Sequence, residues 1–129
     1  MVSIKTLSKI IAILGLTVFV CTAAVTPSIN TQNNILTNYP NPFDSRTEVT
    51  TIIYSLSSTS EVKLTIYDLL GYPVREFASL DETSGIKKIV WDGTNEEGLK
   101  VGKGGYICVL EICNGSIKTL STRKIGVIH

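Results

Sequence analysis

The feature that most constrains the fold of this chain is a period-two alternation of apolar and polar residues in short segments from Thr47 onward. The segments 52–56 and 62–66 each place three apolar side chains on one face, which is typical of strands with one buried side. Turn-forming residues recur about every ten residues, and no segment after the first 24 residues has helical periodicity. These observations predict an all-β protein, a single antiparallel β-sandwich of about seven strands.

Glycine, asparagine, aspartate and serine locate the turns between the predicted strands. Further strands are expected at 74–77, 86–91, 106–112 and 116–128. Loops are expected at 57–60, 81–85 and 92–98. The dipeptide Asn114-Gly115 predicts a β-hairpin, because both of its residues accept the positive φ of a type I′ turn.

The first 24 residues are expected to be a secretory signal peptide rather than part of the folded domain. Two lysines precede a nearly continuous apolar run at 10–20, and the small residues at 21–24 suit signal peptidase. The apolar run is about a dozen residues, shorter than the roughly 20 that a membrane-spanning helix needs. A lipoprotein signal acylated at Cys21 stays an alternative, although a bulky residue precedes the cysteine. The mature chain is expected in the periplasm, on the cell surface or outside the cell. A membrane is expected to be met only through the signal peptide, before its removal.

The charge of the chain argues against nucleic acid as a partner. The full sequence has twelve basic and eleven acidic residues, a formal net charge of +1. The predicted signal peptide holds two of the basic residues and none of the acidic ones, which leaves ten against eleven, or −1, in the mature chain. No block of lysine or arginine remains, so the electrostatic footprint of a nucleic-acid-binding protein is absent from the sequence.

Four short segments, in a fixed order along the chain, are more specific than the strand pattern alone. They are Tyr39-Pro40-Asn41-Pro42-Phe43, then Tyr67-Asp68 with Gly71, then Trp91-Asp92-Gly93 with Gly98, and finally Gly105-Tyr106. The prolines of the first segment fix φ and bias the residues before them toward extended backbone. Phe43 is expected to dock on the core as an apolar plug. Gly71 suits a turn with positive φ, and Trp91 is expected to pack in the core or at the end of a sheet rather than to bind a ligand.

In this order, the four segments resemble the FlgD-like Ig-like C-terminal module, which is closely similar to the type A sorting domain of the type IX secretion system. The resemblance runs from about 38 to 128, with the Trp91-Asp92-Gly93 double turn as its FlgD-like part. The opening segment 39–43 is shared with sorting domains. The resemblance implies an extracytoplasmic, non-catalytic sandwich of the immunoglobulin or fibronectin III type. It divides the chain into a signal peptide at 1–24, an extended leader at 25–38 and the β-sandwich at 39–129.

Most relatives of this kind carry the module at the C-terminus of a larger secreted protein. Here only the predicted signal peptide and leader precede it. The N-terminal scaffold region of a flagellar hook-capping protein is not found before the module, so a role in hook assembly is not carried over. The chain is expected to be either a stand-alone module or a fragment of a longer protein.

Two cysteines, Cys108 and Cys113, remain after removal of the signal peptide. They lie on one predicted strand, five residues apart, which separates them by roughly 16 Å and places them on opposite faces. A disulfide needs Cα atoms within about 7 Å, so these two cysteines are not expected to pair. Cys108 is expected to be a buried thiol on the same face as Tyr106 and Leu110. Cys113, beside the hairpin turn, is expected to be exposed, with an intermolecular bridge as an alternative.

The acidic segment 92–98 carries oxygen ligands that Ca²⁺ accepts, but it lacks the spacing of an EF-hand loop. Asp and Asn are also common in plain turns, and the turn is the favoured interpretation. Asn114 begins a glycosylation sequon, which is likewise interpreted as turn chemistry. No serine elbow or Ser/His/Asp set can be assembled, and the single histidine is the last residue, His129. The chain is expected to be no enzyme and to have no cofactor, metal or small-molecule substrate.

The final segment, with Arg123, Lys124 and Ile125, has two interpretations. As part of a sorting domain it would be read by a secretion apparatus. As a plain edge strand it would carry charges that discourage pairing with other strands. The predicted function is protein–protein contact, with a surface protein or the type IX secretion machinery as partner, and sorting by that machinery stays the alternative.

Overall fold

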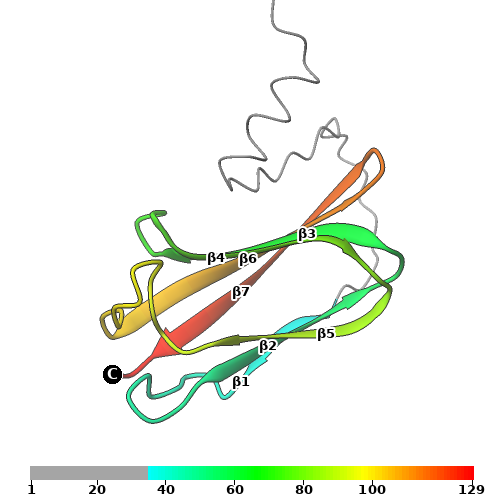
Figure 1. Ribbon diagram of the computed structural model, residues 1–129. Helices are drawn as coiled ribbons and strands as arrows, with labels where there is room; N and C mark the ends of the chain where they lie inside the picture. Colours follow the sequence, from blue (N-terminus) through cyan, green and yellow to red (C-terminus); the bar gives the residue numbers. More distant parts are fainter. Residues whose placement is uncertain (1–34) are drawn as a thin grey trace, which may run out of the picture.

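Seven strands form two antiparallel sheets that face each other, as the computed structural model in Figure 1 shows. The strands are β1 (Leu36–Tyr39), β2 (Thr50–Leu56), β3 (Ser60–Asp68), β4 (Pro73–Glu82), β5 (Gly85–Trp91), β6 (Gly104–Asn114) and β7 (Ile117–Val127). One sheet has the order β1-β2-β5 and the other the order β4-β3-β6-β7. The structure describes residues 35–129, so the predicted signal peptide, Cys21 and most of the predicted leader lie outside the described residues. The predicted all-β sandwich of about seven strands is confirmed.

The core lies between the two sheets and comes from the period-two alternation of the central strands. In β2, every second residue is buried, beginning with Thr50 and ending with Leu56. In the other sheet, Leu64 of β3 stands opposite Leu110 of β6, and neither side chain is exposed. These are the faces that the sequence pattern predicted. Within residues 35–129, no helix is long and apolar enough to cross a membrane.

The connection between β4 and β5, which lie in different sheets, differs from the prediction. The sequence pattern indicated a short strand at 74–77 and a loop at 81–85, whereas β4 continues to Glu82 and β5 begins at Gly85. Only two residues, Thr83 and Ser84, connect them. β4 is an edge strand with mostly half-exposed or exposed residues, so the hydrophobic alternation that marks a strand is weak there. The prediction of a long loop at 81–85 was therefore wrong.

The β6–β7 hairpin is present, but its turn is shifted by one residue from the prediction. Asn114 pairs with Ile117 as part of the ladder, which leaves Gly115 and Ser116 as the loop. Gly115 has a φ of 59°, in the left-handed region that glycine enters without a steric cost. The Asn114 side chain instead donates a hydrogen bond to the Ser58 hydroxyl. The predicted Asn114-Gly115 type I′ turn is therefore corrected to a Gly115-Ser116 loop.

The start of the sandwich also differs from the predicted boundary at Tyr39. Strand β1 begins at Leu36 and pairs with β2 from Leu36 opposite Tyr54 to Tyr39 opposite Thr51. Asn38, in the predicted leader, is buried and donates a hydrogen bond of 2.9 Å from its side-chain amide to the Thr50 hydroxyl. The last three residues of the predicted leader thus belong to the three-stranded sheet.

Candidate interaction surface

Three aromatic rings bring together three of the short segments singled out in the sequence, those with Phe43, Trp91 and Tyr106. Trp91 packs edge-to-face against Phe43 and against Tyr106, with both pairs of ring centroids 5.6 Å apart. All three side chains are buried, and the Trp91 indole donates a hydrogen bond of 2.9 Å to the Thr94 carbonyl oxygen. Edge-to-face pairs of this kind stabilise a core beyond the area they bury. Phe43 is thus the predicted apolar plug, and Trp91 packs in the core as expected.

Gly93 allows the loop after β5 to pass close to the opening segment. Its φ is 76°, and a Cβ added there would lie 2.6 Å from the Cβ of Ser45. Its carbonyl oxygen accepts a hydrogen bond of 2.9 Å from the Val101 amide. Any larger residue at this position would meet both backbone strain and a steric clash. The glycine therefore has a structural role in positioning the Trp91-Asp92-Gly93 turn.

The opening segment closes the outer edge of β7. The Asn41 side-chain amide donates to the Lys124 carbonyl oxygen at 2.9 Å, and its side-chain oxygen accepts from the Gly126 amide at 2.9 Å. Phe43 continues this pairing: its amide donates to the Gly126 carbonyl oxygen and its carbonyl oxygen accepts from the Ile128 amide, both at 3.0 Å. The backbone bends through residues 40–42, and the Tyr39-Pro40 and Asn41-Pro42 peptide bonds are cis. The expected extended backbone is found at Tyr39 in β1, while Asn41 lies in the bend.

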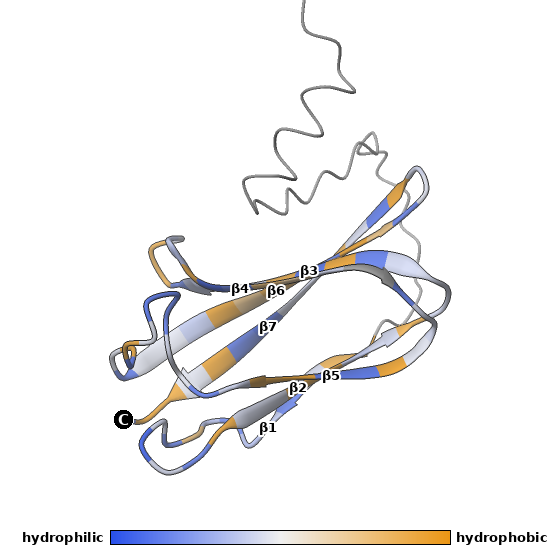
Figure 2. Cartoon of the chain, viewed as in Figure 1, coloured by the Kyte–Doolittle hydropathy of each residue, from blue (hydrophilic) through white to orange (hydrophobic). Residues whose placement is uncertain are grey.

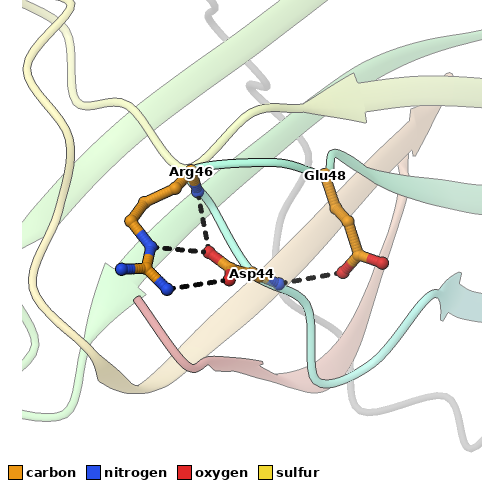
Figure 3. A network of polar contacts seen from close by, with 3 residues as sticks. All are labelled: Asp44, Arg46 and Glu48. Carbon is orange, nitrogen blue, oxygen red and sulfur yellow. Dashed lines mark hydrogen bonds and ion pairs between the residues drawn. The ribbon is translucent and has the colours of Figure 1, made fainter.

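A polar turn fixes the chain between Phe43 and β2 (Figure 3). The Asp44 carboxylate accepts two hydrogen bonds from the Arg46 guanidinium, at 3.3 and 3.1 Å, and one from the Arg46 backbone amide at 3.0 Å. The Asp44 amide in turn donates to the Glu48 carboxylate at 3.0 Å. The bonds from Arg46 hold the pKa of Asp44 below its ordinary value. This local network supports the bend that carries Phe43 into the core.

The predicted sorting residues lie on β7, directly under this closure. Ile125 is fully buried in the core. The Arg123 guanidinium donates a hydrogen bond of 3.3 Å to the Asn38 side-chain oxygen, and the Lys124 carbonyl oxygen is the acceptor for Asn41. The structure thus brings the opening segment and the final segment together, a juxtaposition that the sequence analysis did not foresee.

The turn between β3 and β4 displays large apolar side chains on a rigid backbone. The Asp68 carboxylate accepts hydrogen bonds of 2.9 Å from the amides of both Leu70 and Tyr72. The Gly71 amide donates to the Asp68 carbonyl oxygen at 3.1 Å, with a φ of 90° at Gly71. Leu69, Leu70 and Tyr72 are 65%, 83% and 67% exposed. Asp68 and Gly71 therefore form a turn, as expected. The exposed side chains Leu69, Leu70 and Tyr72 are called the apolar tip. Figure 2 shows hydrophobic colour on part of this β3–β4 turn.

The segment 92–98 uses its polar side chains within its own turns. One Asp92 carboxylate oxygen accepts from the Thr94 hydroxyl at 2.6 Å and from the Thr94 amide at 3.0 Å, and these bonds lower the pKa of Asp92. The Asn95 side-chain oxygen accepts from the amides of Glu97 and Leu99 at 3.1 and 2.9 Å. Gly98 completes the second turn with a φ of 78°. Among the side chains that the structure describes, no group of three or more acidic, histidine or cysteine residues could hold a metal ion.

The same loop covers part of the outer edge of β4. The Glu96 amide donates to the Val74 carbonyl oxygen at 3.1 Å, and the Glu96 carboxylate accepts from the Glu76 amide at 2.6 Å. The Arg75 guanidinium also donates to the Asn95 carbonyl oxygen at 2.8 Å. A sheet edge covered in this way cannot accept another strand at these positions.

The two cysteines after the predicted signal peptide have different environments. Cys108 is a fully buried free thiol on the same face as Tyr106 and Leu110, as expected, and burial raises its pKa to about 12. Cys113 is 5% exposed, so the expectation of an exposed cysteine was wrong. It is disulfide-bonded, and because Cys108 is free, the two cysteines do not pair with each other. Their separation along β6 explains this absence.

Comparisons with known proteins agree with this architecture. The family model described as the FlgD Ig-like domain matches residues 37–115. The chain belongs to the FlgD Ig-like domain family. This family has a structural, non-catalytic kind of fold. No curated protein matches the chain.

Several solved structures share the fold of this FlgD Ig-like domain. The crystal structure of FlgD from P. aeruginosa is similar with a TM-score of 0.55 at 20% identity, over 66% of this chain and 64% of that one. FlgD from Xanthomonas campestris gives a TM-score of 0.54 at 20% identity, over 71% and 67%. Dimeric latent PorU from Porphyromonas gingivalis gives 0.58 at 25% identity, over 71% of this chain and 9% of that one. The chain thus spans under two thirds of the P. aeruginosa protein and a small part of PorU.

Proposed function

We propose that this FlgD Ig-like domain is a non-catalytic, exported module that acts by protein–protein contact at the cell envelope or outside the cell. The observation that carries this proposal is the apolar tip between β3 and β4. Leu70 is 83% exposed, yet the turn beneath it is fixed by four hydrogen bonds to or from Asp68. An apolar side chain on a pre-organised backbone loses little conformational entropy when it binds a partner.

The comparisons support a role in an assembly. One similar structure is PorZ from Porphyromonas gingivalis, described as an essential bacterial surface component of the type IX secretion system; its TM-score is 0.52 at 23% identity, over 73% of this chain and 11% of that one. The X. campestris structure is described in terms of hook capping in flagellar assembly. Both neighbours work with other proteins, which favours a protein partner here. A domain on the same fold can serve many roles, so the exposed surface rather than the fold carries the proposal.

Photo-crosslinking at the apolar tip tests the contact role. A photo-reactive amino acid replaces Leu70 in the full chain, expressed in the producing organism, and Leu120 gives the matched control because it is also an exposed leucine, on β7. We expect one discrete adduct through position 70 in the envelope or the medium, identified by mass spectrometry, and none through position 120. The absence of an adduct at position 70, or the same adducts at both positions, would contradict the proposal.

A second candidate is a type IX sorting or anchoring domain that the secretion machinery recognises. The likeness to PorU, at 25% identity, favours it. A fusion of residues 35–129 to a passenger protein, produced in a host with type IX machinery, tests it. Sorting predicts that the passenger reaches the surface and that a double alanine variant at 123 and 124 retains it inside. A passenger that stays inside with the native segment would reject this candidate.

A further inference from the structure

We propose that the free edge of β5 is a docking site for an extended, acidic segment of another protein, which would add a fourth strand to the β1-β2-β5 sheet. This inference rests on the proposed contact function and assigns it a site and a partner chemistry. A strand that adds to a sheet edge gains its affinity from backbone hydrogen bonds and its specificity from alternate side chains.

The free edge of β5 differs from the other sheet edges. The C-terminal part of the β7 edge is covered by Asn41 and Phe43, and the β4 edge is covered by Glu96 at Val74 and Glu76. The β1 strand lies beside β7, where the Asn38 side chain accepts from Arg123. Within residues 35–129, no segment other than β2 makes a backbone hydrogen bond to Gly85–Trp91. Its outward N–H and C=O groups are therefore free to pair with an incoming strand.

The outer face beside this edge is apolar and carries one unpaired positive charge. Ile86 and Val90 are 70% and 55% exposed, and by alternation they share the outer face with Lys88, which lies midway between them. Ile53 of β2 stands opposite Lys88. The register places the following residues on this face of the three-stranded sheet: Thr37, Tyr39, Thr51, Ile53, Ser55, Ile86, Lys88 and Val90. None of them is acidic.

Two lysines of the other sheet, Lys63 and Lys118, are neutralised by carboxylates. Lys63 lies 3.2 Å from the Glu76 carboxylate, and Lys118 lies 2.9 Å from the Glu111 carboxylate. Lys88 is exposed and makes no ion pair with any side chain that the structure describes, which within 35–129 excludes residues 80 and 81. A carboxylate on an incoming strand, placed opposite Lys88 and flanked by apolar residues two positions away, would complement both the charge and the apolar surroundings.

A second copy of this chain fits the same edge poorly. When two β5 strands pair antiparallel with all seven residues in register, residue 85 meets residue 91 and Lys88 meets Lys88 of the other copy. Like charges directly opposite each other destabilise a strand pair, by up to about 1 kcal/mol. The lysine thus protects the open edge against self-association and selects an acidic segment of a different protein.

Peptide binding to the full chain tests this site. The probe is the synthetic peptide Thr-Val-Thr-Glu-Thr-Val-Thr, with one residue for each of the seven in β5, and the matched peptide has Lys in place of Glu. Binding is followed by NMR chemical-shift changes of the backbone amides at millimolar peptide. We expect changes confined to β5 and the neighbouring outer face, and about fivefold weaker binding of the Lys peptide, since a like-charge pair replaces an opposite-charge pair.

Two variants and one control measurement make the test decisive. K88E is expected to reverse the preference and bind the Lys peptide more tightly, whereas K124E, on the closed edge of β7, is expected to leave the preference unchanged. Sedimentation of the free chain at the same concentration is expected to show monomers. Equal binding of both peptides, no shift changes in β5, or a dimer that forms through β5 would overturn the inference. Because the crosslink at position 70 does not involve β5, failure of the peptide to bind leaves the contact function standing, whereas failure of the crosslink contradicts the contact function proposed for the apolar tip.

Discussion

The two edge strands β5 and β7 look alike in sequence and differ in structure. Each carries two adjacent basic residues, Lys87-Lys88 in β5 and Arg123-Lys124 in β7. In β7 the pair lies under the opening segment, where Arg123 donates to Asn38 and the Lys124 backbone accepts from Asn41. In β5 no segment of the described chain covers the backbone. A basic pair on an edge therefore does not by itself reveal whether the edge is open; contacts with segments distant in sequence decide it.

The largest effect is expected from removing the aromatic plug of the closed edge. F43A deletes a fully buried ring that packs on Trp91, and we expect a loss of about 3–5 kcal/mol in the free energy of unfolding. Urea denaturation of the full chain measures it. The control Y39A removes a side chain that is 79% exposed and is expected to change stability by less than about 0.5 kcal/mol. A loss below about 1 kcal/mol for F43A would show that the opening segment is not part of the core.

A smaller loss is expected from a methyl group inserted between the opening segment and β7. In G126A the new Cβ would lie 2.9 Å from the Cβ of Pro42, so one of the two segments must shift. We expect a loss of about 1–3 kcal/mol, measured by urea denaturation. G102A is the matched control, because its Cβ would meet no atom within 4 Å and its φ is not in the left-handed region. Equal stability of the two variants would argue against close packing at this edge.

Removal of the Asn41 side chain is expected to weaken the closure with less effect on the core. N41A loses the hydrogen bonds to Lys124 and Gly126, and the expected loss is about 1–2 kcal/mol. Hydrogen exchange of the Gly126 amide should accelerate in the same variant. K88A, on the open edge, is expected to stay within about 0.5 kcal/mol of the native chain. If K88A were as destabilising as N41A, the two edges would not differ as described.

The smallest effect concerns the turn that follows β5. Hydrogen bonds from Thr94 lower the pKa of Asp92 in the folded chain, so the ionised carboxylate stabilises the fold above its unfolded pKa of about 3.9. This contribution is lost as the pH falls through the lower folded pKa. Unfolding curves between pH 2 and pH 6 should therefore show stability falling at acid pH, and D92N should flatten part of that fall. If D92N and the native chain had identical pH profiles of stability, the ionisation of Asp92 would not contribute to the stability of the fold.

The sequence predicted the strands best where one face is fully buried. The alternation in 52–56 and 62–66 identified the buried faces of β2 and β3, and the expectation that Phe43 docks on the core is confirmed. The length of β4 was missed because an edge strand with half-exposed residues has little hydrophobic alternation. The turn of the last hairpin was misplaced by one residue because Asn114 and Gly115 both suit the left-handed positions of a turn.

The closure of β7 could not be predicted from local patterns. Asn41 meets Lys124 and Gly126 across more than eighty positions of sequence, and nothing near Asn41 indicates which strand its side chain will bond. The open edge of β5 could not be predicted from local patterns either, because it is open only where no other segment of residues 35–129 bonds to it. Edge accessibility follows from the complete topology, whereas strand faces follow from neighbouring residues.

Residue-resolved amide hydrogen exchange of the free, full chain tests the contrast between the two edges most directly. The amides of Phe43, Gly126 and Ile128 all donate hydrogen bonds at the closed edge, at 2.9–3.0 Å. We predict that these amides exchange at least about tenfold more slowly than the outward-facing amides of β5, from which no residue of 35–129 accepts a backbone hydrogen bond. Equal protection along both edges, or stronger protection of β5, would contradict the account.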